Sequence, residues 1–485
     1  MSTSIAPTFQ INIMPLDKRV ISLKRDSLML IFAEFFAIIF GLLSQVILTR
    51  GLLSEDYGLW IVVFDAALTL FILADPGIST LIGRELPTKL EKSLEFIHST
   101  LKIQLLILPL FILLSILLYA IYPFFIVLIC IGGLSLASSS CYKSFLRSTG
   151  RANWEAIIRV FDRLLLTLGY FLIFSLDGDV TDFAVILCII PSFSLFIIIF
   201  LCLVHSKQLS KENSSDTSKK YYSPISIIKK SLPFFMFIAL FQIMDRMDKF
   251  FLALNVPYED LATYGIALIV YFAGLTIPRI IRNILLPWFS ESLRNDEEIR
   301  NKFIEASKFV YFLSPVGIIS AQLIMMTIPI VVFPEEYIFP DHERFSSESI
   351  FRILLISWSL NLLMAPSFEM IRSFGSPTLL NSISFISVSG SALFGLIFVP
   401  EYGVYGAAGL TCVAPLLFII FSHKFLISSL KITLSFRYYS RLIVLILYSF
   451  SPILFFMPMI SAISGFILLC FISFIMLVFL INYGK

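Results

Sequence analysis

The stretch FAVILCIIPSFSLFIIIFLCLVH, residues 183–205, contains no acidic residue, lysine or arginine. A helix that crosses the hydrocarbon core of a bilayer needs ~20 predominantly apolar residues. This stretch meets that requirement, and runs of the same kind recur along the whole chain. The sequence therefore predicts an all-α integral membrane protein.

The composition favours lipid over water as the solvent for most of the surface. Of the 485 residues, 58% are hydrophobic and only 14% are charged, and the mean hydropathy is +0.92. Soluble domains carry about 25% charged residues. The six cysteines lie in or beside apolar segments without a C-x-x-C pair, and the four histidines form no H-E-x-x-H. We therefore expect neither disulfides nor a metal site.

Apolar runs of the required length predict about fourteen transmembrane helices. The first run begins near Leu28 and is too long for the apolar core of a cleavable signal peptide, so we interpret it as the first span. The expected spans lie near 27–48, 58–82, 101–121, 123–146, 156–176, 183–205, 231–254, 262–288, 308–333, 349–371, 377–399, 403–425, 438–458 and 460–482.

The distribution of basic residues predicts the orientation of these helices, because cytoplasmic loops carry an excess of Lys and Arg. With the N-terminus in the cytoplasm, nearly all of the 36 basic residues fall on the inner side. The outer half keeps Arg50, Arg246, Lys249, Arg344 and Arg352. A wrong helix count would invert the later loops. The pattern therefore predicts cytoplasmic termini at both ends and a multi-pass protein of the plasma membrane, bacterial inner or archaeal.

The chain divides into two related parts. A polar, Ser/Lys-rich segment at 206–230 reads as a flexible cytoplasmic linker between bundles at 27–205 and 231–425. The segments TRGLLSEDYGLWIVVFDAALTL (49–70) and ALNVPYEDLATYGIALIVYFAGL (253–275) share Glu-Asp, Tyr-Gly and an apolar continuation. We predict two six-helix pseudo-repeats, an N-terminal segment at 1–26 and a helix pair at 426–485. Parallel repeats are a common transporter plan.

Four charged residues fall inside the seventh expected span, namely Asp245, Arg246, Asp248 and Lys249. Charge at the centre of a membrane helix costs about 2.5–3.5 kcal/mol per residue on insertion scales, so these groups must pair or line a wet cavity. In an unbroken helix Asp245, Asp248 and Lys249 share one face. The run is interpreted either as a polar functional site or as a salt-bridge cluster that fixes helix packing. Four charges are more than one structural pair needs, which favours the functional site.

Three further arginines are candidates for contact with an anionic headgroup. Arg50 ends the first span on the outer side, where it binds such a group or caps the helix. Arg279 and Arg282 follow Pro278 in the inner third of the eighth span and share one face. They either receive a phosphate from the cytoplasmic side through bidentate contacts or anchor the span as ordinary positive-inside residues.

Carboxylates inside spans are candidates for charge balance or for binding a coupling ion, H⁺ or Na⁺. Alternatively, each of them pairs with a neighbouring basic residue. Asp162 and Arg163 are expected to form a structural pair near the inner end of the fifth span. The candidates for coupling are Glu34, Asp75, Asp245, Asp248 and, more weakly, Asp65.

The motifs that the sequence lacks argue against an enzyme. It contains no G-x-x-x-x-G-K-[ST] phosphate loop and no G-x-S-x-G nucleophile motif. No outer loop is long enough to form a catalytic domain, which disfavours a polymerase or a glycosyltransferase. We therefore expect a transporter with no organic cofactor and no nucleic-acid partner.

Five stretches resemble the Wzx-type O-antigen and polysaccharide repeat-unit flippases of the multidrug/oligosaccharidyl-lipid/polysaccharide exporter superfamily. They are LTRGLLSEDYGLW at 48–60, LADPGIS at 73–79, Ser231–Pro233 with Met244–Asp245, Tyr264–Ala267 leading to Pro278 and Pro287, and VPEYGVYGAA at 399–408. Together the five stretches extend over nearly the whole core of the chain, and their order and spacing match those of the family. Two features depart from the family pattern: Ser54, where Pro is common, and the charged run of the seventh span.

The resemblance implies a flippase for a lipid-linked oligosaccharide on a polyprenyl phosphate or pyrophosphate carrier. It would move the substrate from the cytoplasmic to the outer leaflet for cell-surface polysaccharide biosynthesis, by alternating access driven by an ion gradient. Arg279 and Arg282 would meet the phosphate first and Arg50, Arg246 and Lys249 later, while Asp245 and Asp248 hold the cations of an empty site. Membrane lipids and other polysaccharide-assembly membrane proteins are further expected partners.

Two alternatives stay open. A cation-coupled drug or metabolite exporter of the multidrug and toxin extrusion type is related, but such proteins usually have twelve helices and favour acidic cavities. A non-transporting scaffold of an envelope assembly complex would tolerate neutralisation of the charges inside the membrane.

Overall fold

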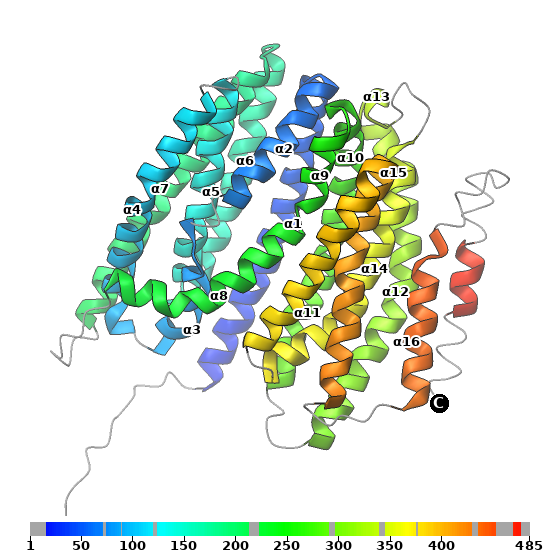
Figure 1. Ribbon diagram of the computed structural model, residues 1–485. Helices are drawn as coiled ribbons and strands as arrows, with labels where there is room; N and C mark the ends of the chain where they lie inside the picture. The colour runs from blue at the N-terminus through cyan, green and yellow to red at the C-terminus, as the bar shows by residue number, and fades with distance from the viewer. Residues whose placement is uncertain are drawn as a thin grey trace, which may run out of the picture.

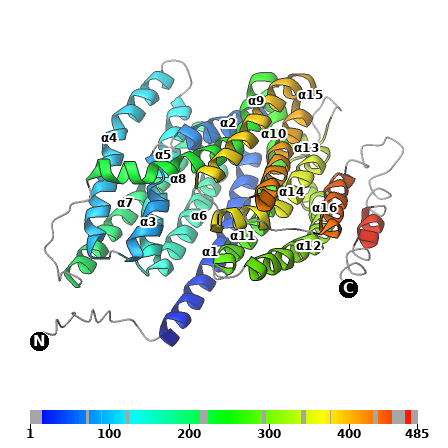
Figure 2. The same cartoon turned by 60° about the horizontal axis from the view of Figure 1, so that its bottom comes forward.

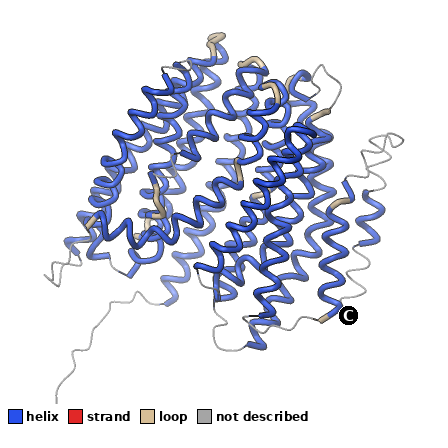
Figure 3. Tube along the Cα trace, in the orientation of Figure 1, coloured by secondary structure: helices blue, strands red, loops and turns tan. Residues whose placement is uncertain are grey.

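The structure is a computed structural model that describes residues 16–70, 74–88, 90–119, 124–212, 223–290, 296–338, 345–374, 377–428, 435–452 and 469–476. Within these residues the chain is helical, with short connections and no strand (Figure 3). A segment inside a bilayer must satisfy its backbone groups internally, and a helix does so within a single segment. The all-α architecture predicted from the sequence is confirmed for this part of the chain.

The first half of the chain forms one bundle, at the left and centre of Figure 1. Within it α1 packs along α6, and α5 packs along α7 and α3. Its elements are α1 (Leu16–Gly51), α2 (Ser54–Leu70), α3 (Ile78–Glu85), the 3₁₀ turns η2 (Leu86–Thr88) and η3 (Leu90–Lys92), α4 (Ser93–Tyr119), α5 (Phe124–Ser148), α6 (Ala152–Ser175) and α7 (Val180–Glu212).

The second half forms a bundle beside the first, at the right of Figure 1, around the buried helix α14. Most residues of α14 are buried, because α10, α11, α12 and α15 all pack against it. The elements are α8 (Pro224–Met244), α9 (Met247–Asn255), α10 (Tyr258–Gly274), α11 (Thr276–Ser290), α12 (Asp296–Val332), α13 (Glu335–Ile338), α14 (Ser347–Phe374), α15 (Pro377–Ser428) and α16 (Phe436–Ser449). Figure 2 shows α16 at the edge of this bundle, beyond α12.

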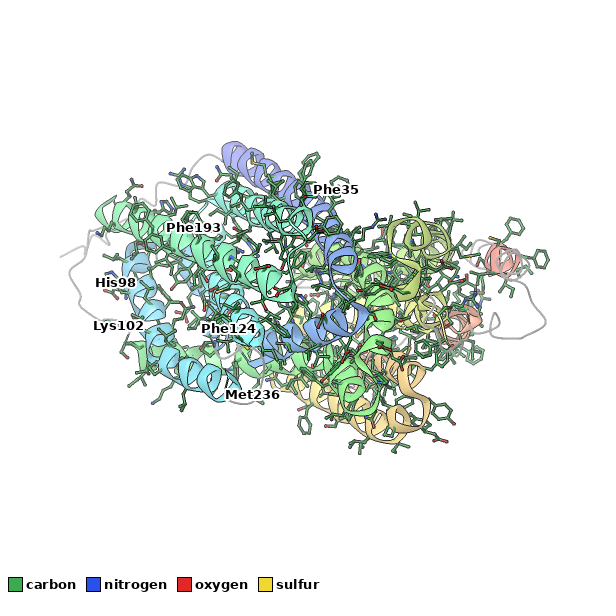
Figure 4. All side chains as sticks on the ribbon, turned by 90° about the horizontal axis from the view of Figure 1, so that it is seen from above. Phe35, His98, Lys102, Phe124, Phe193 and Met236 are labelled. Atoms are coloured by element: carbon green, nitrogen blue, oxygen red, sulfur yellow. The ribbon has the colours of Figure 1, made fainter. Side chains whose placement is uncertain are left out.

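Eight helical stretches of the described chain are long and apolar enough to cross a membrane. Large apolar side chains on their outer faces are exposed; Phe35 and Phe193, 58% and 57% exposed, project from the rim of the first bundle (Figure 4). Such a surface suits lipid. The count of fourteen spans and the cytoplasmic placement of the termini stay predictions. The span expected at 460–482 lies largely outside the described residues, as do residues 453–458 of the span at 438–458.

Several expected spans are not single straight helices. The span at 58–82 is divided between α2 and α3, the span at 231–254 between α8 and α9, and the span at 262–288 between α10 and α11. Conversely, the spans at 377–399 and 403–425 are both contained in α15, which bends sharply at Gly403. The bend requires φ 53° and ψ −125° at this position, a conformation open to glycine and strained for other residues. The expected linker at 206–230 is also shorter, because α7 continues to Glu212 and α8 begins at Pro224.

The two halves close against each other at one end, which the predicted topology makes the outer end. Among the described elements, α2 and α10 make the most extensive contact between the halves. Tyr57 of α2 and Tyr337 of α13 stack edge to face, and Tyr337 OH donates to the carbonyl of Leu52 at 2.6 Å. Ala262 and Ile266 of α10, both fully buried, join the apolar core of the first half. The outer end is thus sealed by apolar packing.

The contact between α2 and α10 is close because each helix places a glycine at it. A Cβ atom on Gly58 would lie 1.8 Å from the carbonyl oxygen of Tyr258, and one on Gly265 would lie 2.3 Å from the side chain of Ile61. Gly58 and Gly265 are the glycines of the Tyr-Gly pair that the two sequence repeats share. The repeated element therefore forms both sides of the outer seal.

On the inner side the halves are linked by α8, which crosses from one bundle to the other (Figure 1). Its first turns pack on α3 and α4 of the first half, where Lys230 Nζ lies 3.3 Å from a carboxylate oxygen of Glu85. Its later turns pack on α15 of the second half. The seventh span thus contacts both bundles. Its charged run, at the end of α8 and the start of α9, lies in the part that packs in the second bundle.

Candidate functional site

The charged run of the seventh span lies at a break between two helices. Asp245 is the C-cap of α8, and Arg246, with φ −129° and ψ −7°, is the N-cap of α9. The expectation that Asp245, Asp248 and Lys249 share one helical face is wrong, because the helix is interrupted between them. Beyond the break Asp248 and Lys249 are each only 2% exposed, whereas Asp245 is exposed.

Asp65 of α2 binds both cations of the run from the opposite half of the molecule. Arg246 Nε lies 3.1 Å from Asp65 Oδ1, and Lys249 Nζ contacts Oδ2. The three side chains are 14%, 15% and 3% exposed, in the order Asp65, Arg246 and Lys249. Arg246 also donates to Gln242, and Lys249 Nζ lies 5.0 Å from the ring centroid of Phe272. We call Asp65, Arg246 and Lys249 the interhalf triad.

Asp245 and Asp248, which the sequence analysis expected to hold these cations, are placed differently. Tyr264 OH of α10 donates to Asp248 Oδ2 at 2.5 Å, and Asp248 Oδ1 is buried without a hydrogen bond. Asp245 instead faces a cavity. A carboxylate as buried as that of Asp248 needs a partner, and here the partner is a tyrosine hydroxyl with no charge.

The cavity lies inside the second half and has a volume of about 70 Å³, which holds a few water molecules. Helices α8 to α11, α14 and α15 all contribute to its wall. It brings together two carboxylates of the seventh span and two guanidinium groups of α11, which the sequence analysis had named separately. The polar side chains that line it are Asp245, Asp248, Tyr271, Arg279, Arg282, Asn361, Ser391 and Thr411.

Glu34 of α1 links cations from both halves. Arg159 of α6 contacts one of its carboxylate oxygens, and Arg279 Nη1 lies 3.9 Å from the other. Arg159 also binds the buried Glu155 at 2.7 Å, and Arg147 binds Glu155 at 2.6 Å. The side chain of Arg279 is 56% exposed, so its long contact with Glu34 contributes little stability. Arg279 is therefore available to another anion.

Arg282 and Arg372 lie near a second buried carboxylate, that of Glu369 in α14. Glu369 is 1% exposed, and its carboxylate oxygens make no hydrogen bond, although Arg372 Nη1 lies 3.5 Å from Oε2. The guanidinium of Arg282 lies over the ring of Phe368, 5.3 Å from its centroid. An arginine pair, Arg279 and Arg282, thus faces the cavity from α11.

Arg50 and Asp75 have structural partners. Arg50 Nε and Nη2 donate to the carbonyl of Val332 at 3.2 and 2.9 Å. Because Val332 ends α12, Arg50 caps a helix of the other half and not its own. Asp75 Oδ1 accepts from the amide of Ser79 at 3.0 Å, and Oδ2 accepts from the hydroxyl of Ser140 at 2.8 Å. Both groups help to fix the fold around the site.

The expected pair of Asp162 with Arg163 is replaced by another. Asp162 lies 3.3 Å from Lys143 Nζ of α5 and accepts a hydrogen bond from Ser194 of α7. Adjacent residues of a helix point in different directions, so they rarely pair with each other. The sequence pattern does not single out Glu155 or Glu369, and it marks Asp65 only as a weaker candidate. Only their position inside apolar segments marks these residues in the sequence.

No group of three or more His, Cys, Asp or Glu side chains among the described residues is arranged to hold a metal ion. The cysteines are free thiols. The chemistry of the site is therefore that of fixed charges: cations that bind anions, and carboxylates that bind cations or protons.

No protein-family model and no curated protein matches the chain. Solved structures do match its fold. A structure described as the Lipid II flippase MurJ in an inward closed conformation matches with a TM-score of 0.64 and 15% identity, over 94% of this chain and 98% of that one. A multidrug resistance MATE family transporter of the MOP superfamily, in an outward-facing conformation, matches with a TM-score of 0.60 and 17% identity, over 85% and 97%.

A third match is a MOP superfamily transporter from Pyrococcus furiosus, with a TM-score of 0.60, 15% identity and coverage of 85% and 96%; its description reports a binding pocket of reverse polarity. At these identities the likeness establishes the fold. The chain has the fold of a transporter of the multidrug/oligosaccharidyl-lipid/polysaccharide superfamily, as the sequence resemblance predicted. It shares this fold with membrane transporters, and eight of its described helical stretches are long and apolar enough to cross a membrane.

Proposed function

We propose that this protein flips a lipid-linked oligosaccharide, carried on a polyprenyl phosphate or pyrophosphate, from the cytoplasmic to the outer leaflet of the plasma membrane. The product would serve cell-surface polysaccharide biosynthesis. The observation that carries the proposal is the pair Arg279 and Arg282 on α11, which face a polar cavity while the outer end of the molecule is closed. Guanidinium groups bind phosphates through paired hydrogen bonds.

The proposed path begins at Arg279, whose side chain is more than half exposed and only loosely held by Glu34. Arg282 lies one helical turn nearer the inner end of α11, so a phosphate that enters from the cytoplasmic side contacts both arginines before it moves outward. Arg246 and Lys249 come later, and Arg50 lies at the outer end. Opening of the outer seal, with closure on the inner side, would then expose the substrate to the other leaflet by alternating access.

An ion gradient would drive the cycle in this proposal, with H⁺ or Na⁺ as the coupling ion. Asp245 and Asp248 favour this because they line the same cavity as the arginines, and a carboxylate inside a membrane protein marks an ion or proton path by default. Glu34 is a further candidate because it joins the two halves. Asp75 is a weaker one, since both its oxygens are already hydrogen-bonded.

The two cavity carboxylates also favour a second candidate function, a cation-coupled drug or metabolite exporter. A cationic substrate would bind Asp245 and Asp248 where the flippase substrate would bind Arg279 and Arg282. The two functions therefore use opposite charges of one cavity, and neutralising one sign at a time separates them.

The test is leaflet accessibility of a labelled lipid-linked oligosaccharide in proteoliposomes. Arg279→Ala should abolish protein-dependent translocation, and Arg279→Lys should retain part of it, because the charge remains while the paired hydrogen bonds are lost. The matched control is Arg151→Ala, an exposed arginine between α5 and α6 whose guanidinium lies over the ring of Trp154. Translocation by Arg279→Ala at the wild-type rate would refute the assignment, and transport of cationic drugs lost in Asp245→Asn would favour the exporter.

A further inference from the structure

The interhalf triad of Asp65, Arg246 and Lys249 joins elements that alternating access must separate. Asp65 belongs to α2 of the first half, and the two cations flank the start of α9 in the second. Asp65 lies 11 positions after Ser54, where α2 begins, which corresponds to about 16 Å below the outer end. It therefore lies beneath the apolar seal formed by α2 and α10.

The two cations depend on Asp65 for charge balance. Lys249 is 3% and Arg246 15% exposed, and Asp65 is the one carboxylate within ion-pair distance of either among the described residues. The nearer alternative, Asp248, points its Oδ2 at Tyr264 instead. When the halves begin to part at the outer end, α2 carries Asp65 away, and the two cations lose the carboxylate that pairs with them. Unpaired buried charge is strongly unfavourable.

The geometry of the triad resembles that of a bound anion. Each carboxylate oxygen of Asp65 faces a different cation, Arg246 at Oδ1 and Lys249 at Oδ2. A phosphate group presents oxygens in a similar arrangement and carries at least as much negative charge. A phosphate that entered between the halves could therefore take over both cations as Asp65 leaves.

We propose that Asp65 is an internal substitute for the phosphate or pyrophosphate of the substrate, and that exchange of Asp65 for this group on Arg246 and Lys249 releases the outer seal. This inference rests on the proposed function for the identity of the anion. It makes Asp65 a positioning residue: it holds the outer end closed while the anion site is empty. Opening then requires a loaded substrate, which prevents the empty carrier from opening outward.

The first measurement is thermal unfolding of the purified protein with inorganic pyrophosphate, against potassium chloride at equal ionic strength. Asp65→Asn removes the negative charge that pairs with Arg246 and Lys249 and hardly changes the size of the side chain. Pyrophosphate should therefore raise the Tm of the Asp65→Asn protein by several degrees and raise the Tm of the wild type less. Asp65→Asn combined with Lys249→Gln should lose the response. An equal response in all three proteins, or none in Asp65→Asn, would overturn the exchange.

The second measurement follows the seal itself. Ala262 is fully buried between the halves, so Ala262→Cys reacts with a membrane-impermeant maleimide from the outer side only when the seal opens. Asp65→Asn should raise the labelling rate at least several-fold, and Asp65→Glu should not. The matched control is Asp56→Asn, the same change in the same helix at a residue that forms no ion pair within the part of the chain that the structure describes. Equal rates for Asp65→Asn and Asp56→Asn would contradict the proposal.

If Asp65→Asn does not fold, the same labelling test can be made in a protein that keeps Asp65. Pyrophosphate should accelerate labelling of Ala262→Cys in a chain that keeps Asp65, after subtraction of the labelling of native cysteines in the parent protein; no acceleration would overturn the exchange. Farnesyl pyrophosphate, which adds an apolar tail, should act at lower concentration than inorganic pyrophosphate. Equal concentrations would assign the site to a soluble anion and overturn the link to a lipid. None of these readouts uses flipping, so this inference and the proposed function can fail separately.

Discussion

At the residue scale, the site depends on carboxylates whose partners differ in charge. Asp65 is bound by two cations, whereas the side chain that binds Asp248 is the uncharged hydroxyl of Tyr264. In the first half Tyr57, the corresponding tyrosine of the repeat, donates at 2.8 Å to the neutral amide of Gln45. The two tyrosines therefore make the same kind of bond to acceptors of different charge.

Tyr264→Phe should destabilise the protein more than Tyr57→Phe. A hydrogen bond to a charged group contributes about 1.5–3 kcal/mol, against about 0.5–1.5 kcal/mol for a neutral pair. The buried carboxylate of Asp248 would also lose its hydrogen bond to a side chain. The check is the Tm of both variants in the same detergent. A larger loss of Tm in Tyr57→Phe would show that the bond to Asp248 has no special role.

Glu369 and Arg372 should show strong coupling in a double-mutant cycle. Arg372→Ala leaves a carboxylate that is 1% exposed without its nearest cation, and because Arg372 itself is 44% exposed we expect a loss of about 1–3 kcal/mol. Glu369→Gln should lose less, and the double variant should recover much of the loss of Arg372→Ala. The free energies of unfolding of the four proteins decide this, and additive losses would mean that the contact contributes nothing.

The sequence predicts which residues are charged inside the membrane, but not how they pair. The run from Asp245 to Lys249 is conspicuous because each charge there is costly. Its partner Asp65 lies 181 residues away from Arg246 and is an isolated acidic residue in an apolar helix. Nothing near Asp65 in the sequence encodes the approach of α9. The pairing follows from how the two bundles meet, which local pattern does not contain.

At the scale of elements, hydropathy predicts the apolar runs and misses their interruptions. The run at 231–254 is apolar on both sides of its charges and therefore reads as one helix, yet it is broken between α8 and α9. The break is compatible with the fold because the side chains around it have partners on α2 and α10. Such partners depend on tertiary structure. The position of the span can therefore be predicted from the sequence, and the position of its break cannot.

Gly58→Ala should be destabilising, and Gly41→Ala in α1 should not. A Cβ on Gly58 meets a backbone oxygen at 1.8 Å, so α2 and α10 must move apart, at a cost of about 1–3 kcal/mol. Nothing lies within 4 Å of a Cβ on Gly41, where alanine gains up to about 1 kcal/mol of helix propensity. Thermal unfolding of both variants is the measurement, and a stabilised Gly58→Ala would refute the close crossing.

At the scale of the whole molecule, the all-α fold predicted from the sequence agrees with the structure, and solved structures of a lipid II flippase and of a MATE family transporter share this fold. The topology stays a prediction, and it rests on the basic inner loops. We expect a reporter that is active only in the cytoplasm to be active when fused after Lys485 or inserted at residue 218, and inactive when inserted at Gly178 between α6 and α7. Activity at Lys485 and Gly178 together would require a different number of spans.

The crossing of α2 and α10 also bears on the ancestry of the protein. A half-length ancestor that paired with a copy of itself would have sealed its outer end with two identical Tyr-Gly elements, and every substitution would have changed both at once. Fusion into one chain separates them. Gly58 now meets a backbone carbonyl, whereas Gly265 meets the tip of the Ile61 side chain, which can move. A side chain added at Gly265 therefore meets an atom that can move, whereas one added at Gly58 meets the backbone, so the two halves of the crossing differ in how much substitution they tolerate.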